Sequence, residues 1–381
     1  MTAARLECIS SGAAARLSTR AAFFIAGFGM SAWAPLVPYA KQRLDIGPGV
    51  LGLLLLCVGA GLISTGPFAG ILTSRFGCRR VICGASLCLC LCLPLLAAAA
   101  TAPLLAMVLL IFGGSLSLLD IAMNIQAAMV EMASGKALMS GFHGLFSLGG
   151  IAGAAGVSLL LSAGAGPLAA TLCVSAIILA LLLAWGRHLL PFGRTGDAPG
   201  FVWPHGIILF IGLLCFILFL TEGAMLDWSA VFLTSLRHVD PARSGLGYAL
   251  FSITMTLGRL NGDRLVRRAG GRLVLAAGPL CAGLGLVLAV AFHPAIIAFI
   301  GFAMVGVGAS NAVPVLYSAV GRQKIMPPGL AISAIATLGY CGILAGPAAI
   351  GFVAHATSLP VAFLGIAGLL LIVSISSRFV L

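Results

Sequence analysis

The 381 residues are 61% hydrophobic and only 8% charged, whereas about one quarter of the residues of a soluble domain are charged. This composition excludes an ordinary soluble domain and predicts an integral membrane protein. The formal net charge of +12 does not indicate nucleic-acid binding, because the basic residues stand at the ends of apolar runs rather than in a stripe with interleaved aromatic residues.

Apolar runs follow one another along the whole chain, each near the length of about 20 residues that a helix needs to cross a bilayer. The first run follows a few arginines, but it is long and has no clear cleavage site, so we expect it to be retained as a span. The predicted spans are 20–40, 49–73, 81–100, 104–130, 137–163, 168–187, 206–233, 246–265, 273–292, 295–320, 329–353 and 360–377. The expected fold is therefore an all-α integral membrane protein with twelve transmembrane helices.

A short basic turn occurs twice, each time between two apolar runs. The repeated positions are Leu72, Arg75, Gly77 and Arg79, and then Leu265, Arg268, Gly270 and Arg272. Every pair is 193 residues apart (268 − 75, for example), which is close to half of the 381 residues. Such a repeat predicts two pseudo-symmetric six-helix bundles, an organisation typical of secondary transporters. We expect a tail at 1–19, bundles at 20–187 and 206–381, and a linker at 188–205.

The distribution of basic residues predicts the orientation in the membrane. With the N-terminus inside, sixteen of the 21 Lys and Arg residues fall in inner segments, and Arg259 lies within a helix. Cytoplasmic segments of membrane proteins carry the excess of Lys and Arg. We therefore expect a cytoplasmic tail, a cytoplasmic linker and both termini inside. The remaining basic residues, in outer segments, are Lys41, Arg43, Arg237 and Arg243.

The chain lacks the usual signatures of enzymes and metal sites. Cys88, Cys90 and Cys92 lie two residues apart in an apolar run, and helical geometry turns such residues to different sides. There is no phosphate-binding Gly-x-x-x-x-Gly-Lys-Ser/Thr sequence and no pair of histidines spaced for a zinc protease. We expect no enzymatic activity, no metal and no cofactor.

Several motifs point to a known family. The first turn, Gly70 to Arg80, reads Gly-Ile-Leu-Thr-Ser-Arg-Phe-Gly-Cys-Arg-Arg and resembles the signature of the major facilitator superfamily, with Ser74 in place of the usual acidic residue. Other motifs resemble the fucose-permease-like group of that superfamily: Asp120 to Asn124 with Glu131, His143 to Gly149, Glu222 to Trp228, and Gly339-Tyr340. The resemblance implies a protein of the bacterial inner membrane. It also implies alternating access around a cavity lined by the first, fourth, seventh and tenth helices.

Three acidic residues stand inside or near the end of predicted spans, where a charge is costly and commonly functional. They are Asp120, Glu222 and Asp227, and Asn124 shares a helix face with Asp120. Desolvation disfavours the charged form of a carboxyl, which would let it bind and release a proton. We predict these four residues for proton coupling or substrate contact. The alternative is that each acid pairs only with Arg259, His143 or backbone.

Further residues receive other expected roles. Trp33, Asn311, Tyr317 and Trp228 are candidates for contact with substrate, although ordinary packing would also explain Trp33 and Tyr317. His143, at the start of the fifth helix, is expected to anchor that helix, or alternatively to join a proton path with Asp120 or Asn124. The predicted cytoplasmic gate comprises Arg75, Arg79, Arg80, Glu131, Arg259, Asp263, Arg268 and Arg272.

Glycines form small faces on the fifth and eleventh predicted helices and would allow close approach of neighbours. If they meet the opposite half, they are sliding surfaces; the alternative is static packing. The residues are Gly149, Gly150, Gly153 and Gly156, and Gly342, Gly346 and Gly351.

The function predicted from these features is secondary active transport of a small polar solute, sugar-like or another metabolite, coupled to protons. A proton-antiport exporter of drugs or metabolites is an alternative, because the pair Gly346-Pro347 resembles a feature of exporters. A substrate sensor built on a carrier fold is an alternative of another class. The expected partners are the solute, protons and the lipid bilayer, with no nucleic acid, and we expect a monomer.

Overall fold

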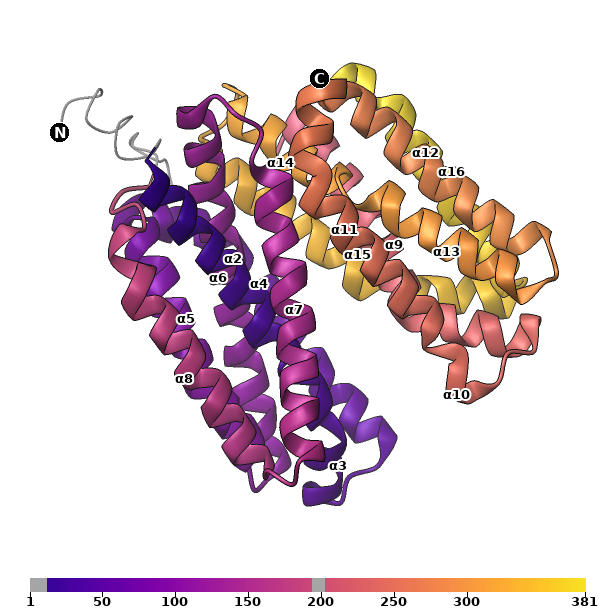
Figure 1. Cartoon of the computed structure of the whole chain (residues 1–381), viewed down its shortest axis with the longest axis horizontal. Helices are drawn as coiled ribbons and strands as arrows, with labels where there is room; N and C mark the ends of the chain where they lie inside the picture. Colours follow the sequence, from indigo (N-terminus) through magenta and orange to yellow (C-terminus); the bar gives the residue numbers. More distant parts are fainter. Residues whose placement is uncertain (1–11, 194–202) are drawn as a thin grey trace. The chain divides into compact units, whose positions relative to one another are not determined.

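The computed structural model describes residues 12–193 and 203–381, and in these two ranges all regular secondary structure is helical (Figure 1). Residues 1–11 of the predicted tail and 194–202 of the predicted linker lie outside the described residues. The elements are α2 (Ala13–Ser31), η1 (Ala34–Leu36), α3 (Val37–Leu44), α4 (Pro48–Phe76), α5 (Cys78–Ala98), α6 (Ala102–Ser134), α7 (Met139–Ser162), α8 (Pro167–Trp185), η2 (Gly186–His188), α9 (Ile207–Arg237), α10 (Pro241–Ser244), α11 (Leu246–Ala269), α12 (Gly271–Ala291), α13 (Ala295–Ala309), α14 (Ala312–Arg322), α15 (Pro328–Ala356) and α16 (Leu359–Val380).

The predicted series of spans is present in the described chain. Eleven stretches are long and apolar enough to cross a membrane, and two of them, Ala13–Leu44 and Ala295–Arg322, combine consecutive helices. The predicted span 246–265 is also helical, as α11, but it does not reach the same hydropathy. Arg259, Asp263 and the arginines of the second basic turn lower its apolar character.

Two spans predicted as continuous helices are interrupted. The first breaks between α2 and α3, where Pro35 and Pro38 follow Trp33. The tenth breaks between α13 and α14, at Ser310 and Asn311. Proline has no N–H and its ring clashes with the preceding turn, so it fits most readily in the first turn of a helix. Pro314 accordingly lies in the first turn of α14.

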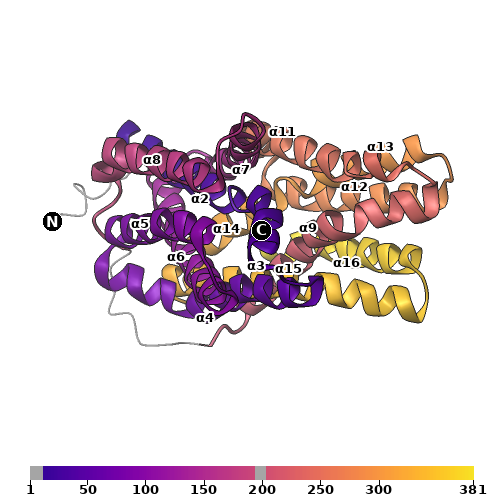
Figure 2. The ribbon, with the colours of Figure 1, turned by 90° about the horizontal axis from the view of Figure 1, so that it is seen from below.

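The described chain forms two compact units, each of which takes a short segment from the other half of the sequence. The first unit contains Met1–Gly135, Leu145–Trp203 and Gly321–Thr337, and the second contains Lys136–Gly144, Pro204–Val320 and Leu338–Leu381. In the first unit α6 packs against α4 and α5; in the second, α12 packs against α13 and α16 (Figure 2). The division at 20–187 and 206–381 stays a prediction.

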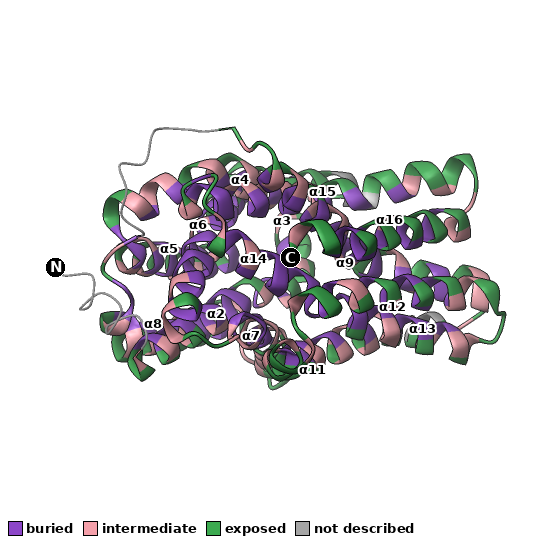
Figure 3. Ribbon diagram, turned by 90° about the horizontal axis from the view of Figure 1, so that it is seen from above, coloured by how far each residue is buried: buried purple, intermediate pink, exposed green. Residues whose placement is uncertain are grey.

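Many large apolar residues are exposed on both units, and Figure 3 colours the exposed positions green. Leu91 is 68% exposed and Leu183 75% in the first unit, and Phe352 is 76% exposed in the second. A soluble monomer rarely exposes extended apolar surface. These faces are suited to contact with lipid.

The predicted glycine faces pack within one half of the chain. A Cβ at Gly149 would overlap the Phe24 carbonyl of α2, and a Cβ at Gly342 would overlap the Phe216 carbonyl of α9. Helix α7 therefore lies directly on α2, and α15 on α9, which is the static packing alternative. Gly156 has no neighbour within 4 Å of such a Cβ.

Candidate functional site

The second unit contains a partly buried ion pair between α9 and α11. Nη2 of Arg259 donates to Oε1 of Glu222 at 2.9 Å, and the two side chains are 8% and 20% exposed. This is the pairing that the sequence left open as the alternative for Glu222. A charge-assisted bond of this kind is stronger than a neutral one, and each charge has its partner within the same unit.

The break between α13 and α14 provides a second acceptor for Arg259. In a continuous helix the carbonyl of Ser310 would bond the N–H of residue 314, but Pro314 has none. Nε of Arg259 donates to this carbonyl at 3.3 Å. The proline thus creates a free backbone oxygen beside the ion pair, and the arginine uses it.

Asn311 fixes the break against α11. Its amide Nδ2 donates to the Gly258 carbonyl at 3.1 Å and to Oγ of Ser310 at 2.8 Å. The side chain fills the space where a Cβ on Gly262 would lie, so only glycine fits at that position. Asn311, predicted to contact substrate, is 5% exposed, and its Oδ1 has no hydrogen-bond partner among the described residues.

The beginning of α7 belongs to the same unit and packs beside this cluster. The ring of His143 meets the edge of Tyr317 with centroids 5.8 Å apart, and both residues are buried. Oδ1 of Asp263 accepts from the N–H of Gly141 at 3.0 Å. The first N–H groups of a helix lack partners within it and attract negative charge, so Asp263 caps α7 from α11.

The first unit contains the other predicted coupling pair. Nδ2 of Asn124 donates to the Asp120 backbone oxygen at 2.9 Å and to its Oδ1 at 3.3 Å. Asn124 is fully buried and Asp120 is half-buried. Trp33 lies at the break between α2 and α3 and is 6% exposed.

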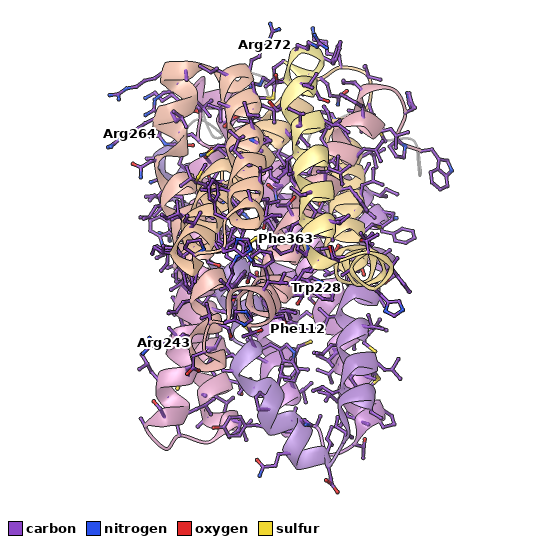
Figure 4. The ribbon with its side chains drawn as sticks, turned by 90° about the vertical axis from the view of Figure 1, so that its right-hand side faces the viewer. Phe112, Trp228, Arg243, Arg264, Arg272 and Phe363 are labelled. Atoms are coloured by element: carbon purple, nitrogen blue, oxygen red, sulfur yellow. The ribbon has the colours of Figure 1, made fainter. Side chains whose placement is uncertain are left out.

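Asp227 and Trp228 lie further along α9, beyond the ion pair. Asp227 is exposed, and the half-buried Trp228 packs close to Gly351 of α15. Figure 4 shows Trp228 between Arg243 and the pair Arg264 and Arg272, which lie toward opposite ends of the second unit.

The predicted gate residues make different contacts. Arg79 donates from Nε to the Leu189 carbonyl at 3.0 Å and also bonds the Arg187 carbonyl, so it holds η2, the short helix that follows α8. Arg75 lies over the Phe76 ring, and Glu131 is 9% exposed. The other exposed members are Arg80, Arg268 and Arg272. Their role as a gate stays a prediction.

Sequence reasoning missed the backbone partners of the site. Ser310, Gly258 and Gly262 make or permit its contacts, yet none is unusual among so many small residues. Pro314, four residues after Ser310, was the available signal.

Known proteins match this sequence over nearly the whole chain. Residues 21–324 match the model of the Major Facilitator Superfamily. An uncharacterized MFS-type transporter of Yersinia pestis is 53% identical, with 98% of each chain covered.

Solved structures show the same fold. Two structures of FucP, one described as the Escherichia coli fucose:proton symporter, give TM-scores of 0.76 and 0.80 at 17% and 18% identity, with 96% of this chain and 98% of each FucP chain covered. The proton:xylose symporter XylE gives a TM-score of 0.72 at 11% identity, with 97% of this chain and 95% of the other covered.

A helical membrane fold with a repeated basic turn and charged side chains paired inside its spans defines the class of multi-pass membrane transporters. The chain belongs to the Major Facilitator Superfamily, as the sequence motifs indicated.

Proposed function

We propose that this transporter couples the movement of a small polar solute to a proton across the bacterial inner membrane, by alternating access. The observation that carries the proposal is the Glu222–Arg259 pair, with its bond of 2.9 Å and only slight exposure. Paired charges inside a span are expensive to place there and commonly belong to a substrate or proton pathway.

The pair provides a direct link between a proton and a conformational change. An ionised Glu222 holds the guanidinium of Arg259, which also bonds the Ser310 carbonyl. When a proton binds the Glu222 carboxylate, the charge attraction is lost and the hydrogen bond weakens. Arg259 is then able to donate to another acceptor, such as a solute oxygen, and loss of the proton restores the pair.

Asp120 and Asn124 supply a second polar pair in the first unit. Each of the two pairs by itself offers donors and acceptors suited to a solute rich in hydroxyl groups. FucP and XylE are described as symporters of fucose and xylose with protons, which supports a sugar-like solute here.

Reconstituted protein tests the proposal. Thermal-shift screening against sugars, other metabolites and organic cations selects a ligand, and uptake into proteoliposomes is then driven by an imposed pH gradient. We expect Glu222→Gln to abolish proton-driven uptake while equilibrium counterflow continues. Asp45→Asn is the matched control, because Asp45 is an exposed carboxyl in a left-handed turn that asparagine also tolerates.

Three outcomes would contradict the proposal. Proton-driven uptake by Glu222→Gln at the wild-type rate would remove this carboxyl from coupling. Binding without counterflow would indicate a sensor. Proton-driven movement of the solute only in the direction opposite to the proton would indicate an exporter.

A further inference from the structure

In each half of the chain, an arginine donates hydrogen bonds to the last carbonyls of the third membrane-spanning helix. This helix is α5 in the first half and α12 in the second. Arg43, in the last turn of α3, donates from Nε to the Ala99 carbonyl and from Nη2 to the Leu96 carbonyl, both at 2.9 Å. Its Nη1 also bonds the Ala97 carbonyl. The last carbonyls of a helix have no partners within it, and one guanidinium therefore satisfies three of them at the end of α5.

Arg237 makes the corresponding contacts in the second unit. It is the last residue of α9, and its Nη2 donates to the carbonyls of Ala289 and Val290 at 2.7 and 3.0 Å, at the end of α12. Its Nη1 also donates to the Leu236 carbonyl at 2.9 Å. The guanidinium lies 4.8 Å from the centroid of the Phe232 ring, a favourable cation–π distance.

The two contacts correspond under the internal repeat. The acceptor pairs Leu96 and Ala289, and Ala97 and Val290, are both 193 residues apart (289 − 96 and 290 − 97), as are the two basic turns. The arginines are 194 apart (237 − 43). Both belong to the four basic residues that the charge distribution assigns to the outer side.

We propose that Arg43 and Arg237 are symmetry-related positioning residues that fasten the outer end of the first helix of each half to the third helix. The guanidinium suits this role because it presents several donors in a rigid plane and a positive charge at the negative end of a helix. The proposal goes beyond solute and proton transport, since it concerns which helices must move together.

The attached elements differ between the two halves: Arg43 holds a short helical segment, and Arg237 holds the end of a long helix. Beyond the break at η1, α3 is a short segment in which Ala40 is the buried residue, so Arg43 is a principal attachment for it. Helix α9 is continuous from Ile207 to Arg237 and is also attached through Glu222. Loss of Arg43 should therefore release a whole segment, and loss of Arg237 only the final turns of a helix.

Hydrogen–deuterium exchange of the purified, full-length protein in lipid nanodiscs tests this directly. We expect Arg43→Met to speed amide exchange about tenfold over 37–44, equivalent to about 1.4 kcal/mol, with little change over 13–31. Arg237→Met should do the same over about 230–237. Lys41→Met and Arg243→Met are matched controls, because each removes an exposed basic side chain close to one of the two arginines.

The conservative variants separate positioning from general stability. Arg43→Lys should give an intermediate increase, because an ammonium keeps the charge but reaches fewer carbonyls. Exchange over 37–44 that equals the Lys41→Met control, or that rises equally throughout the first unit, would overturn the proposal. If Arg43→Met does not fold, the lysine variant decides by the same comparison. The measurement needs no transported solute, so its failure is distinct from failure of the proposed function.

Discussion

At the scale of single residues, the candidate site depends on the ion pair between Glu222 and Arg259, because a buried charge needs a partner. Arg259 and Glu222 lie on neighbouring helices of one unit, and their contact is augmented by the backbone oxygen that Pro314 leaves free. Removal of either charge leaves the other with poor compensation in a partly dry environment. The pair should therefore show strong energetic coupling.

A double-mutant cycle measures this coupling. We expect Glu222→Gln and Arg259→Gln each to lower the thermal unfolding midpoint, and the double variant to lose less than the sum. The coupling energy should be about 0.5–3 kcal/mol, the range typical of contacting residues. Each kcal/mol corresponds to about 2–4 °C in the unfolding midpoint of a unit of this size. Additive shifts would show that the two side chains do not stabilise one another.

The sequence predicted the charged residues of the site better than their arrangement. Glu222 and Arg259 stood out because charges are rare within apolar runs, and their pairing was one of the alternatives considered. The contribution of Ser310 depends on a helix break, and that of Gly262 on a neighbouring asparagine. Both are tertiary effects that no local pattern of a chain rich in small apolar residues reveals.

At the scale of secondary-structure elements, glycine determines how closely helices approach. Gly149 places α7 on the Phe24 carbonyl of α2, and Gly342 places α15 on the Phe216 carbonyl of α9. The two glycines are 193 residues apart (342 − 149), so the contact repeats with the basic turn. Periodicity indicated small faces on these helices, but it did not indicate that each face meets a helix of its own half.

Alanine substitution tests this packing. Gly149→Ala should destabilise the protein by about 1–3 kcal/mol, the usual cost of overpacking, because the new methyl group would overlap a backbone oxygen. Gly156→Ala on the same helix has open space and should be neutral or slightly stabilising, since alanine favours helix. Thermal unfolding of both variants in one detergent provides the measurement, and equal midpoints would contradict the assigned contact.

At the scale of the whole molecule, the internal repeat made it possible to predict the fold from the sequence. The spans were located because hydropathy and length are properties of single segments, and the repeat of 193 residues related them in pairs. Span ends were less well predicted, since α6 and α9 contain 33 and 31 residues. Helices longer than the hydrocarbon thickness tilt or extend beyond it, and sequence patterns do not define where they stop.

The orientation of the chain is the remaining prediction at this scale. Arg264 and Arg272 lie toward one end of the second unit and Arg243 toward the other (Figure 4). The basic turn and the segment after α9 can therefore lie on opposite sides of a membrane. Because Lys and Arg concentrate on the cytoplasmic side, we expect the basic turns and both termini to be inside.

Accessibility labelling in intact cells tests this orientation. In a cysteine-free background, a cysteine introduced at Asp45 or Asp240 should react with a membrane-impermeant maleimide, because both positions lie in segments predicted to face outward. A cysteine at Arg80 or Arg268 should react only after the membrane is opened, although these side chains are equally exposed in the folded chain. The reverse labelling pattern would show that the protein has the opposite orientation in the membrane. The Arg43 and Arg237 attachments would then lie at the cytoplasmic ends of their helices, and the contacts within each unit would be unaffected.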